Sequence, residues 1–498
     1  MASNLPDYVA SAQPLSRDNR VSWFSNVGPT YAGIMLWFVF WHDVPVGAGI
    51  HPDHGQYSAF AGGSLAQGLG IAFLGLVLAA LICHFLFYLV PGLLGMKTGL
   101  PLYIVGTSTY GVQGGFIMPG FVMGLLQFGW LAVNAFFAGI LLCAPWEQGP
   151  GTIAHAAVAT VWAIAAAFMG LKGIQYVAKV ATFFPLIPLV ILIILFVSTM
   201  SGIGSFDPAT TIAAYDGLEV ELTDKSGAVI ETLTPGPALS TWGVIAMIGT
   251  YVVGFFATAG AAGSDIAMNS RDEKNVQIGG LVGIALATII AGGLSLLIVA
   301  GIHGSGTMPD GAVLRTSNLM EVAMGNPTTA KIFMYLLAIA AFPAACFSAF
   351  IAANSFKTTL PKVNPFVSVG LGTLVSIILA VTGVAGNAIG VFSIIGASFG
   401  PVCGSMCADY LLAGKKWAGP RAGFNPAGWI AWIAGFAVGA IHLMPGMGEV
   451  IPWWGLLCPP VAAFIVGFVL YFLLAKIGLT SATLEMPGAA EETKPADA

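Results

Sequence analysis

Long apolar stretches recur along this chain, and short polar segments separate them. A helix needs about 20 apolar residues to cross the hydrocarbon core of a bilayer. The sequence therefore predicts an all-α integral membrane protein with about twelve transmembrane helices. These are expected at residues 28–48, 65–90, 116–142, 153–172, 176–200, 240–266, 277–302, 330–355, 365–384, 387–412, 427–445 and 451–475.

The predicted helices divide into two repeats of five, followed by two more. The expected parts are a cytoplasmic N-terminal segment (1–27), a first repeat (28–200), an extracellular acidic loop (201–239), a second repeat (240–412), two additional helices (413–475) and a disordered cytoplasmic tail (476–498). Within the loop, alternation from Leu218 to Leu222, followed by Lys225-Ser226-Gly227, predicts a small hairpin.

The composition supports the membrane assignment. Charged residues make up 8% of the chain and hydrophobic residues 57%, whereas a soluble domain carries about 25% charged residues. The net charge of -5 gives no basic surface for nucleic acid. The six cysteines form no metal-binding spacing and are interpreted as packing residues. No cluster of reactive side chains is visible, so an enzyme is not expected.

The distribution of Lys and Arg predicts the orientation, because cytoplasmic loops carry an excess of these residues. If both termini are cytoplasmic, fourteen of the 17 Lys and Arg residues lie inside. The three outside are Lys225, Arg315 and Lys331. The expected location is the plasma membrane, which for a bacterial cell is the inner membrane.

Two of the predicted spans contain helix-breaking residues together with polar groups. One run extends from Trp41 to Gly49 and the other from Gly254 to Asp265, five helices later. Unwound backbone at membrane depth is tolerated only where it is buried in protein or lines a cavity. Interrupted segments at matching places in two halves are typical of transporters with inverted repeats. We therefore predict broken helices one and six.

Asp43 is the most informative ionisable residue, because a carboxylate inside a span is expensive unless it faces the protein interior or water. The neighbouring His42 could titrate near neutral pH. One interpretation is a role in binding substrate or carrying a proton. The alternative is that Asp43 caps the broken helix or lies near the outer interface.

Aromatic and amide side chains in other spans are candidates for binding a flat ligand. Trp130 and Asn134 are four residues apart, so they share one helix face. The ring could stack on a ligand while the amide bonds its edge. Phe255 and Phe256 offer a second stacking surface, and Asn354 a second amide. Each of these residues could equally serve packing or structural hydrogen bonding.

Several stretches resemble the nucleobase–cation symporter family, the permeases for cytosine, purines, uracil, hydantoins, allantoin and thiamine precursors. They follow the order and spacing of that family from about residue 95 to residue 416. The matching stretches are Met96 to Leu100, Tyr110 to Gly115, Pro119, Gly129 to Asn134, Gly254 to Thr258 with Asp265, Ala353 to Ser355 with Pro361, and Pro401, Gly404, Asp409, Tyr410, Lys415 and Lys416.

The resemblance implies the leucine-transporter fold, with the ligand held between aromatic residues of helices three and six. By position, Trp130 would stack on one face of the ligand and Phe256 would take the place of the second aromatic. Asn134 and Asn354 would bond the ligand's edge, and Trp41 falls at the break in helix one.

The chain departs from the family pattern at three places. Members with a sodium site carry two adjacent hydroxyl residues in helix eight, where this chain has Ser348 and Ala349. Met268 stands where the family usually has Arg, and Asp43 is not expected in a typical cytosine permease. Proton coupling through Asp43 and His42, sodium coupling through an incomplete site that includes Ser348, and uncoupled transport remain three separate hypotheses.

The prediction is a secondary-active importer of a small planar nitrogen heterocycle, with a nucleobase such as cytosine or a purine as the first choice. Alternatives within the same fold are a hydantoin, allantoin, a thiamine precursor or a small organic cation. A passive channel and a transporter-like ligand sensor are the alternatives from other classes. Expected partners are the small-molecule substrate and the lipid bilayer, with no obligate protein partner and no cofactor besides Na⁺ or H⁺ as coupling ion.

Overall fold

The computed structural model describes most of the chain. The described residues are 5–28, 44–45, 49–51, 55–57, 60–172, 183–216, 220–223, 229–233, 237–306, 316–444, 446–451 and 457–486. Within them, ten helices are long and apolar enough to cross a membrane. This protein is therefore an integral membrane protein, as the sequence predicted.

Each predicted span from the second to the twelfth contains a described helix. Most of the first, including the run from Trp41 to Asp43, lies outside the described residues. In chain order the helices are α4 (Gly68–Ile82) with α5 (Leu89–Thr98), α8 (Met123–Cys143), α9 (Ile153–Lys172), α11 (Leu186–Thr199), α13 (Thr241–Ala261), α15 (Glu273–Gly280) with α16 (Ala287–Gly304), α18 (Pro327–Thr359), α19 (Pro365–Val381), α20 (Ala388–Leu412), α21 (Pro426–Ala440) and α23 (Pro459–Lys476). Shorter helices are α1 (Asp7–Ala10), α6 (Leu102–Val105), α7 (Thr107–Tyr110), α12 (Pro208–Asp216), α14 (Gly263–Ala267), α17 (Thr316–Met324) and α22 (Met447–Val450).

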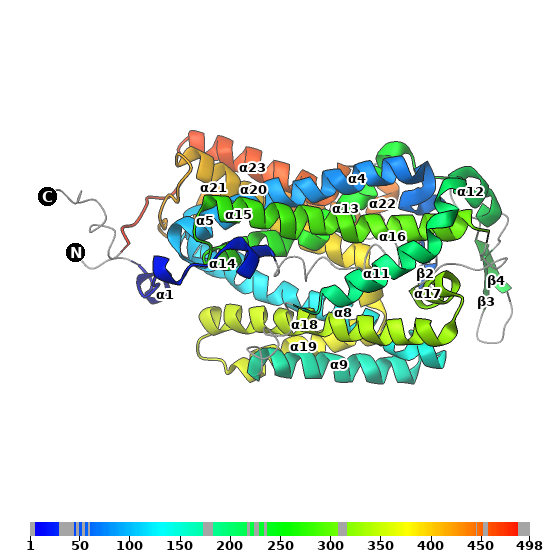
Figure 1. The fold of residues 1–498 in the computed structure, drawn as a ribbon. Helices are drawn as coiled ribbons and strands as arrows, with labels where there is room; N and C mark the ends of the chain where they lie inside the picture. Colours follow the sequence, from blue (N-terminus) through cyan, green and yellow to red (C-terminus); the bar gives the residue numbers. More distant parts are fainter. Residues whose placement is uncertain are drawn as a thin grey trace.

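The long helices form two packed groups (Figure 1). In the first group, α8, α9, α18 and α19 all pack against one another. In the second group, α13 packs against α4 and α20, and α20 packs against α21 and α23. The first group joins helices three and four of one repeat to helices eight and nine of the other. This pairing of equivalent helices is what the predicted repeat requires.

Several helices depart from regular α geometry. Three segments are π-helical, namely Cys83–Tyr88, Phe116–Val122 and Leu281–Leu286. Helix six is interrupted at Ala262, which separates α13 from α14. The predicted interruption in helix six therefore lies near the end of the run that began at Gly254, and residues 254–261 stay helical despite their glycines.

The described part of the chain contains two small hairpins outside the helices. Strands β3 (Val220–Thr223) and β4 (Val229–Leu233) pair antiparallel, which confirms the hairpin predicted in the acidic loop. A second antiparallel pair, β1 (Gly49–His51) with β2 (Gly55–Tyr57), was not predicted. Both pairs lie at the end of the molecule opposite α1 (Figure 1).

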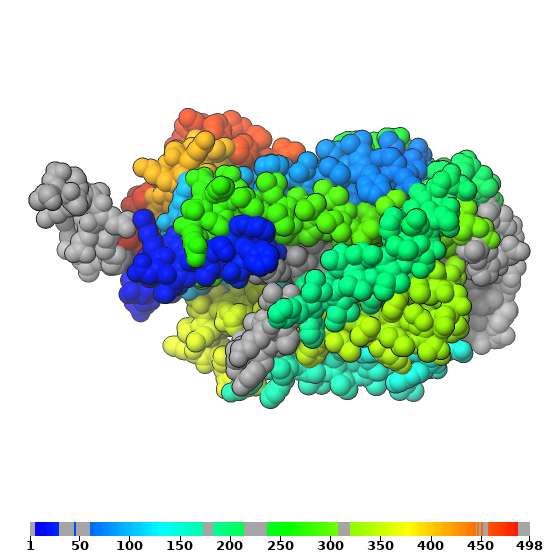
Figure 2. All heavy atoms as spheres, viewed as in Figure 1, coloured from blue at the N-terminus to red at the C-terminus, as the bar shows by residue number. Residues whose placement is uncertain are grey.

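The N-terminal segment, residues 5–28, lies along the other end of the molecule, here called the terminal end. The main-chain N–H of Val21 donates to the carbonyl of Asn269 at 2.8 Å. The N–H of Trp23 donates to Asn275 Oδ1 at 2.9 Å. These bonds attach the segment to the connection between helices six and seven and to the first turn of α15, and Figure 2 shows this segment on the surface beside them.

The tail predicted to be disordered, 476–498, differs from that expectation in its first part. Residues 477–486 follow α23 at the terminal end and lie against the connection between α20 and α21. The N–H of Ala422 donates to the carbonyl of Ala482 at 2.9 Å, and an isolated antiparallel bridge joins Arg421 to Thr483. Main-chain hydrogen bonds hold residues 477–486 in place. The prediction of disorder rested on a composition rich in Ala, Glu and Pro, which does not indicate where main-chain bonds form.

A buried ion pair lies beneath this tail. Arg421 donates to Asp409 Oδ1 at 2.8 Å, and the two side chains are 12% and 4% exposed. The hydroxyl of Tyr471 donates to the same oxygen at 2.7 Å. Asp409 belongs to α20 and Tyr471 to α23, so the carboxylate ties two helices to the connection that precedes α21.

Candidate functional site

An aromatic cluster occupies the boundary between the two helix groups. Trp130 lies near the middle of α8, and its ring meets Phe255 of α13 edge-on, with centroids 4.5 Å apart at 88°. Phe392 of α20 completes the cluster, 5.2 Å from Trp130 and 5.3 Å from Phe255. These separations are in the range favoured for aromatic pairs. The three rings come from helices three, six and ten.

A hydrogen bond reinforces this boundary. Trp130 Nε1 donates to Thr258 Oγ1 at 3.1 Å. Thr258 lies three residues after Phe255, so both residues share the face of α13 that is turned to Trp130. Trp130 and Phe255 each keep part of their surface exposed, whereas Phe392 is 1% exposed. Trp130 and Phe255 are therefore the two rings of the cluster on which a flat ligand could stack.

Asn134 lies one turn beyond Trp130 on the same face of α8 and is buried. Its Nδ2 donates to the carbonyl of Ala341 in α18 at 3.1 Å. Its Oδ1 accepts from Trp162 Nε1 in α9 at 2.9 Å. The amide therefore joins three helices of the first group, which shows that at least part of its role is structural.

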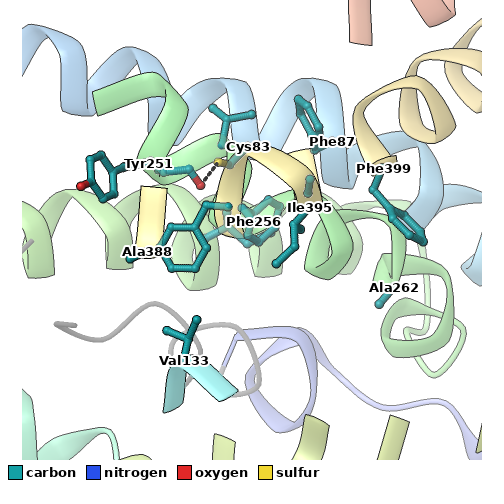
Figure 3. Packing of buried hydrophobic residues seen from close by; sticks show 14 of the residues in the cluster. Cys83, Phe87, Val133, Tyr251, Phe256, Ala262, Ala388, Ile395 and Phe399 are labelled. Atoms are coloured by element: carbon teal, nitrogen blue, oxygen red, sulfur yellow. Dashed lines mark hydrogen bonds between the residues drawn. The ribbon is translucent and has the colours of Figure 1, made fainter. Parts of the chain in front are cut away.

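Phe256, the expected second stacking residue, occupies a different place. Its side chain is 0% exposed and belongs to the packed core. Figure 3 shows Phe256 beside Ile395, whereas Val133 of α8 stands apart from it. The residue that α13 presents to Trp130 is the neighbouring Phe255.

The remaining predicted residues are not gathered around the cluster. Asn354 is exposed near the end of α18, and its carbonyl accepts from the Thr358 hydroxyl at 3.2 Å. Ser348 is half-buried, and its hydroxyl donates to the carbonyl of Ala344 at 3.3 Å. Both residues stay predicted site residues on the strength of the sequence.

The other three predicted residues come from helix one. Trp41, His42 and Asp43 lie outside the described residues. The predicted break in helix one and the roles of these residues there therefore rest on the sequence alone.

Three residues of the site were missed by the sequence analysis: Thr258, Phe392 and Trp162. Thr258 had a usable signal, since it follows Phe255 by three residues. Phe392 and Trp162 had none, because they reach the site from helices far away in sequence and their spacing to Trp130 carries no helical period.

Among the described residues, several charged groups lie at the terminal end. Lys97 of α5 donates to the Tyr410 hydroxyl at 2.8 Å and to the carbonyl of Lys415 at 3.0 Å. Asp265 in α14 accepts from the N–H of Leu102 at 3.2 Å. Burial raises the pKa of the Asp265 carboxyl to about 6, against the opposite effect of this hydrogen bond.

No protein-family model matches the sequence, and no curated protein sequence matches it. Solved structures do resemble it over almost its whole length. The inward-facing conformation of Mhp1 covers 97% of this chain at 15% identity, with 97% of that chain matched and a TM-score of 0.62. A closed conformation of the same nucleobase-cation-symport-1 family transporter, with bromovinylhydantoin bound, gives a TM-score of 0.60 at 14% identity over 95% of this chain and 97% of that one.

This protein has the fold of these transporters. A substrate-bound, outward-open Na⁺-coupled sialic acid symporter shares it, at 14% identity and a TM-score of 0.54 over 96% of this chain and 93% of that one. The predicted leucine-transporter fold with its five-plus-five repeat is thereby confirmed. At sequence identities of 14–15%, the structural similarity establishes the fold and does not identify the ligand.

Proposed function

We propose that this protein is a secondary-active transporter that imports a small planar nitrogen heterocycle by alternating access. The observation that carries this proposal is the cluster of Trp130, Phe255 and Phe392 at the boundary between the two helix groups. In transporters of this architecture, one group rocks against the other around a site between them. A ligand held at this boundary would therefore touch both moving parts.

The chemistry of the boundary favours a flat ring with a polar edge. Aromatic faces stack on apolar ring faces, while amide groups bond donors and acceptors at an edge. Trp130 supplies the face and Asn134, one turn away, supplies the amide. A nucleobase is the first choice, and hydantoins, allantoin, thiamine precursors or a small organic cation are the alternatives. The fold shared with a transporter that binds bromovinylhydantoin agrees with a ligand of this size.

We infer from the matched sequence stretches that the chain is a divergent member of the nucleobase–cation symporter family. The position of the second aromatic supports this divergence. The resemblance implied Phe256, whereas the ring that contacts Trp130 is that of Phe255, one residue earlier. Ser348 next to Ala349 leaves the family's sodium-binding hydroxyl pair incomplete. The coupling ion is therefore proposed to be H⁺ through Asp43 and His42, or Na⁺ through the site that includes Ser348.

A ligand screen tests the substrate. The purified protein would be heated with nucleobases, hydantoins, allantoin, thiamine precursors and organic cations, each with and without sodium. A ligand that binds the folded state raises the melting temperature by mass action. We expect a shift with one planar heterocycle that is lost in Trp130→Ala and kept in Trp417→Ala, whose indole donates to Val105 outside the cluster. A shift confined to organic cations would reject the heterocycle.

Uptake measurements test the coupling ion. Proteoliposomes would be assayed in sodium-free buffer, with and without a pH gradient, and in sodium buffer without one. Accumulation driven by the pH gradient and lost in Asp43→Asn is expected for proton coupling. Accumulation that needs sodium and falls in Ser348→Ala, with Asp43→Asn unaffected, would reject it. Equilibration without accumulation in every condition would show uncoupled transport.

A further inference from the structure

The Asn134 amide has two different ends, and its surroundings distinguish them. An amide NH2 group only donates hydrogen bonds, and an amide oxygen only accepts them. Trp162 Nε1 lies 2.9 Å from Asn134 Oδ1, and an indole N–H can only donate. The end of the amide that faces α9 must therefore be the oxygen.

The NH2 end of the Asn134 amide is identified by its own partner. Asn134 Nδ2 lies 3.1 Å from the carbonyl oxygen of Ala341, which can only accept. A rotated amide would place NH2 against the indole N–H and oxygen against a carbonyl, so both bonds would be lost together. Because Asn134 is 8% exposed, water cannot readily replace those partners. One orientation of the amide is thus strongly preferred.

This orientation determines what remains for a ligand. The NH2 group has two N–H donors and the oxygen has two acceptor positions. Ala341 uses one donor and Trp162 uses one acceptor position. Among the described residues, one N–H and one acceptor position of the same amide have no further partner. A ring edge that carries a carbonyl beside an N–H, as in a cyclic lactam or imide, is the matching partner.

Trp162 is itself held firmly in place. Its ring packs edge-on against Phe342 of α18, with centroids 5.0 Å apart at 78°. Phe342 is the residue after Ala341, the acceptor of the amide. The same turn of α18 therefore positions both the indole and the carbonyl that orient Asn134.

We propose that Trp162 is a positioning residue that locks the Asn134 amide, so that the site selects cyclic lactam and imide edges. This inference rests on the proposed function, in which Asn134 faces the substrate. Trp162 acts through Asn134 and does not touch the ligand. Its role is to determine where the donor and the acceptor of the Asn134 amide lie, and the ligand's edge must match that arrangement.

The test compares ligands that differ only in their N–H groups. The probes are hydantoin with 1,3-dimethylhydantoin, and uracil with 1,3-dimethyluracil, and the measured quantity is the ratio of dissociation constants within each pair. Trp162→Phe keeps an aromatic ring beside Phe342 but removes the N–H. Trp432→Phe is the matched control, because that indole donates to the Ser398 carbonyl at 2.9 Å away from the site.

The wild-type protein should prefer the unmethylated member of at least one pair. Trp162→Phe should reduce that preference by about threefold to tenfold, the effect of one hydrogen bond, whereas Trp432→Phe should leave it unchanged. A purely structural role for Trp162 would lower the melting temperature without changing the ratio. Trp162→Leu, which carries no hydrogen-bond donor, replaces Trp162→Phe if the latter does not fold, and the same reduction is expected.

The outcomes separate this inference from the function on which it rests. If Trp162→Phe keeps the ratio and Asn134→Leu abolishes it, positioning by Trp162 is wrong and the proposed function stands. If Asn134→Leu also keeps the ratio, Asn134 does not form hydrogen bonds with the ligand's edge and the inference is overturned. If the wild-type protein binds neither pair, the inference is overturned, whereas the proposed function fails only if no planar heterocycle in the wider ligand screen shifts the melting temperature.

Discussion

Thr258 accepts the indole N–H of Trp130 at 3.1 Å, and this bond crosses from α13 to α8. It therefore joins the two helix groups that would move against each other during transport. Around it, Phe255 and Phe392 close on the same indole ring. The site and the boundary between the moving parts are thus built from the same side chains.

Replacing Thr258 by Val tests this bond. Val keeps the shape but removes the acceptor, so the folded protein should lose about 1 kcal/mol and melt at a lower temperature. Thr373→Val is the control, because that buried hydroxyl donates only within α19, to the carbonyl of Val369 at 2.7 Å. Equal melting temperatures for the two variants would show that the Trp130 bond adds nothing to stability.

The stability of the terminal end should depend on pH through Asp265. Burial raises the pKa of this carboxyl to about 6, above its unfolded value of about 4. A raised pKa in the folded state means that folding favours the protonated form, so stability is highest below about pH 4 and falls as the pH rises through about 6. Asp265→Asn should remove this part of the pH dependence of the melting temperature. Asp18→Asn, at an exposed carboxylate, is the comparison. An unchanged profile in Asp265→Asn would assign the pH dependence to other groups.

Breaking the buried ion pair between Arg421 and Asp409 should lower the free energy of unfolding. Arg421→Met leaves the Asp409 carboxyl 4% exposed without its cation, so a loss of about 3–5 kcal/mol is expected. The double variant Arg421→Met with Asp409→Asn should recover part of that loss, because no buried charge is then left unpaired. Melting temperatures of the two single variants and the double variant provide the measurement. Strictly additive losses would mean that the two side chains do not interact.

A pair of glycines in α19 tests the packing of the first helix group. A Cβ at Gly372 would lie 2.0 Å from the Phe128 ring of α8, whereas a Cβ at Gly370 meets nothing within 4 Å. Gly372→Ala should therefore destabilise the protein by about 1–3 kcal/mol through overpacking. Gly370→Ala should be neutral or slightly stabilising, because Ala favours the helix. If the two substitutions have the same effect on the melting temperature, the contact between α8 and α19 is looser than the structure shows.

Much of the fold could be predicted because a membrane helix can be recognised from the length of its apolar stretch alone. An apolar stretch long enough to cross the bilayer is visible without knowledge of its neighbours. The hairpin formed by β3 and β4 was equally local, since alternation and turn residues lie side by side in the sequence. The terminal tail was not predictable in this way, because most of its hydrogen bonds to residues 420–427 join main-chain atoms that every sequence possesses, and only Ser481 adds bonds that involve a side chain, to Phe424 and Asn425.

The site was predicted less completely, for a geometric reason. Successive residues on a helix point about 100° apart, so the sequence cannot tell whether Phe255 or Phe256 faces α8. Packing decides it, since Phe256 fills the core while Phe255 meets Trp130. Phe392 and Trp162 reach Trp130 and Asn134 only through tertiary contact. Spacing rules concern single helices and could not have found them.

The measurement that tests the central claim most directly is counterflow into proteoliposomes loaded with an unlabelled heterocycle chosen by the ligand screen. Labelled ligand should accumulate transiently with the wild-type protein and with Trp432→Ala, and accumulation should be abolished or strongly reduced in Trp130→Ala. That result would establish that this protein transports a planar ligand through the aromatic boundary between the two helix groups. Full counterflow in Trp130→Ala, with a folded protein and unchanged affinity, would contradict the account.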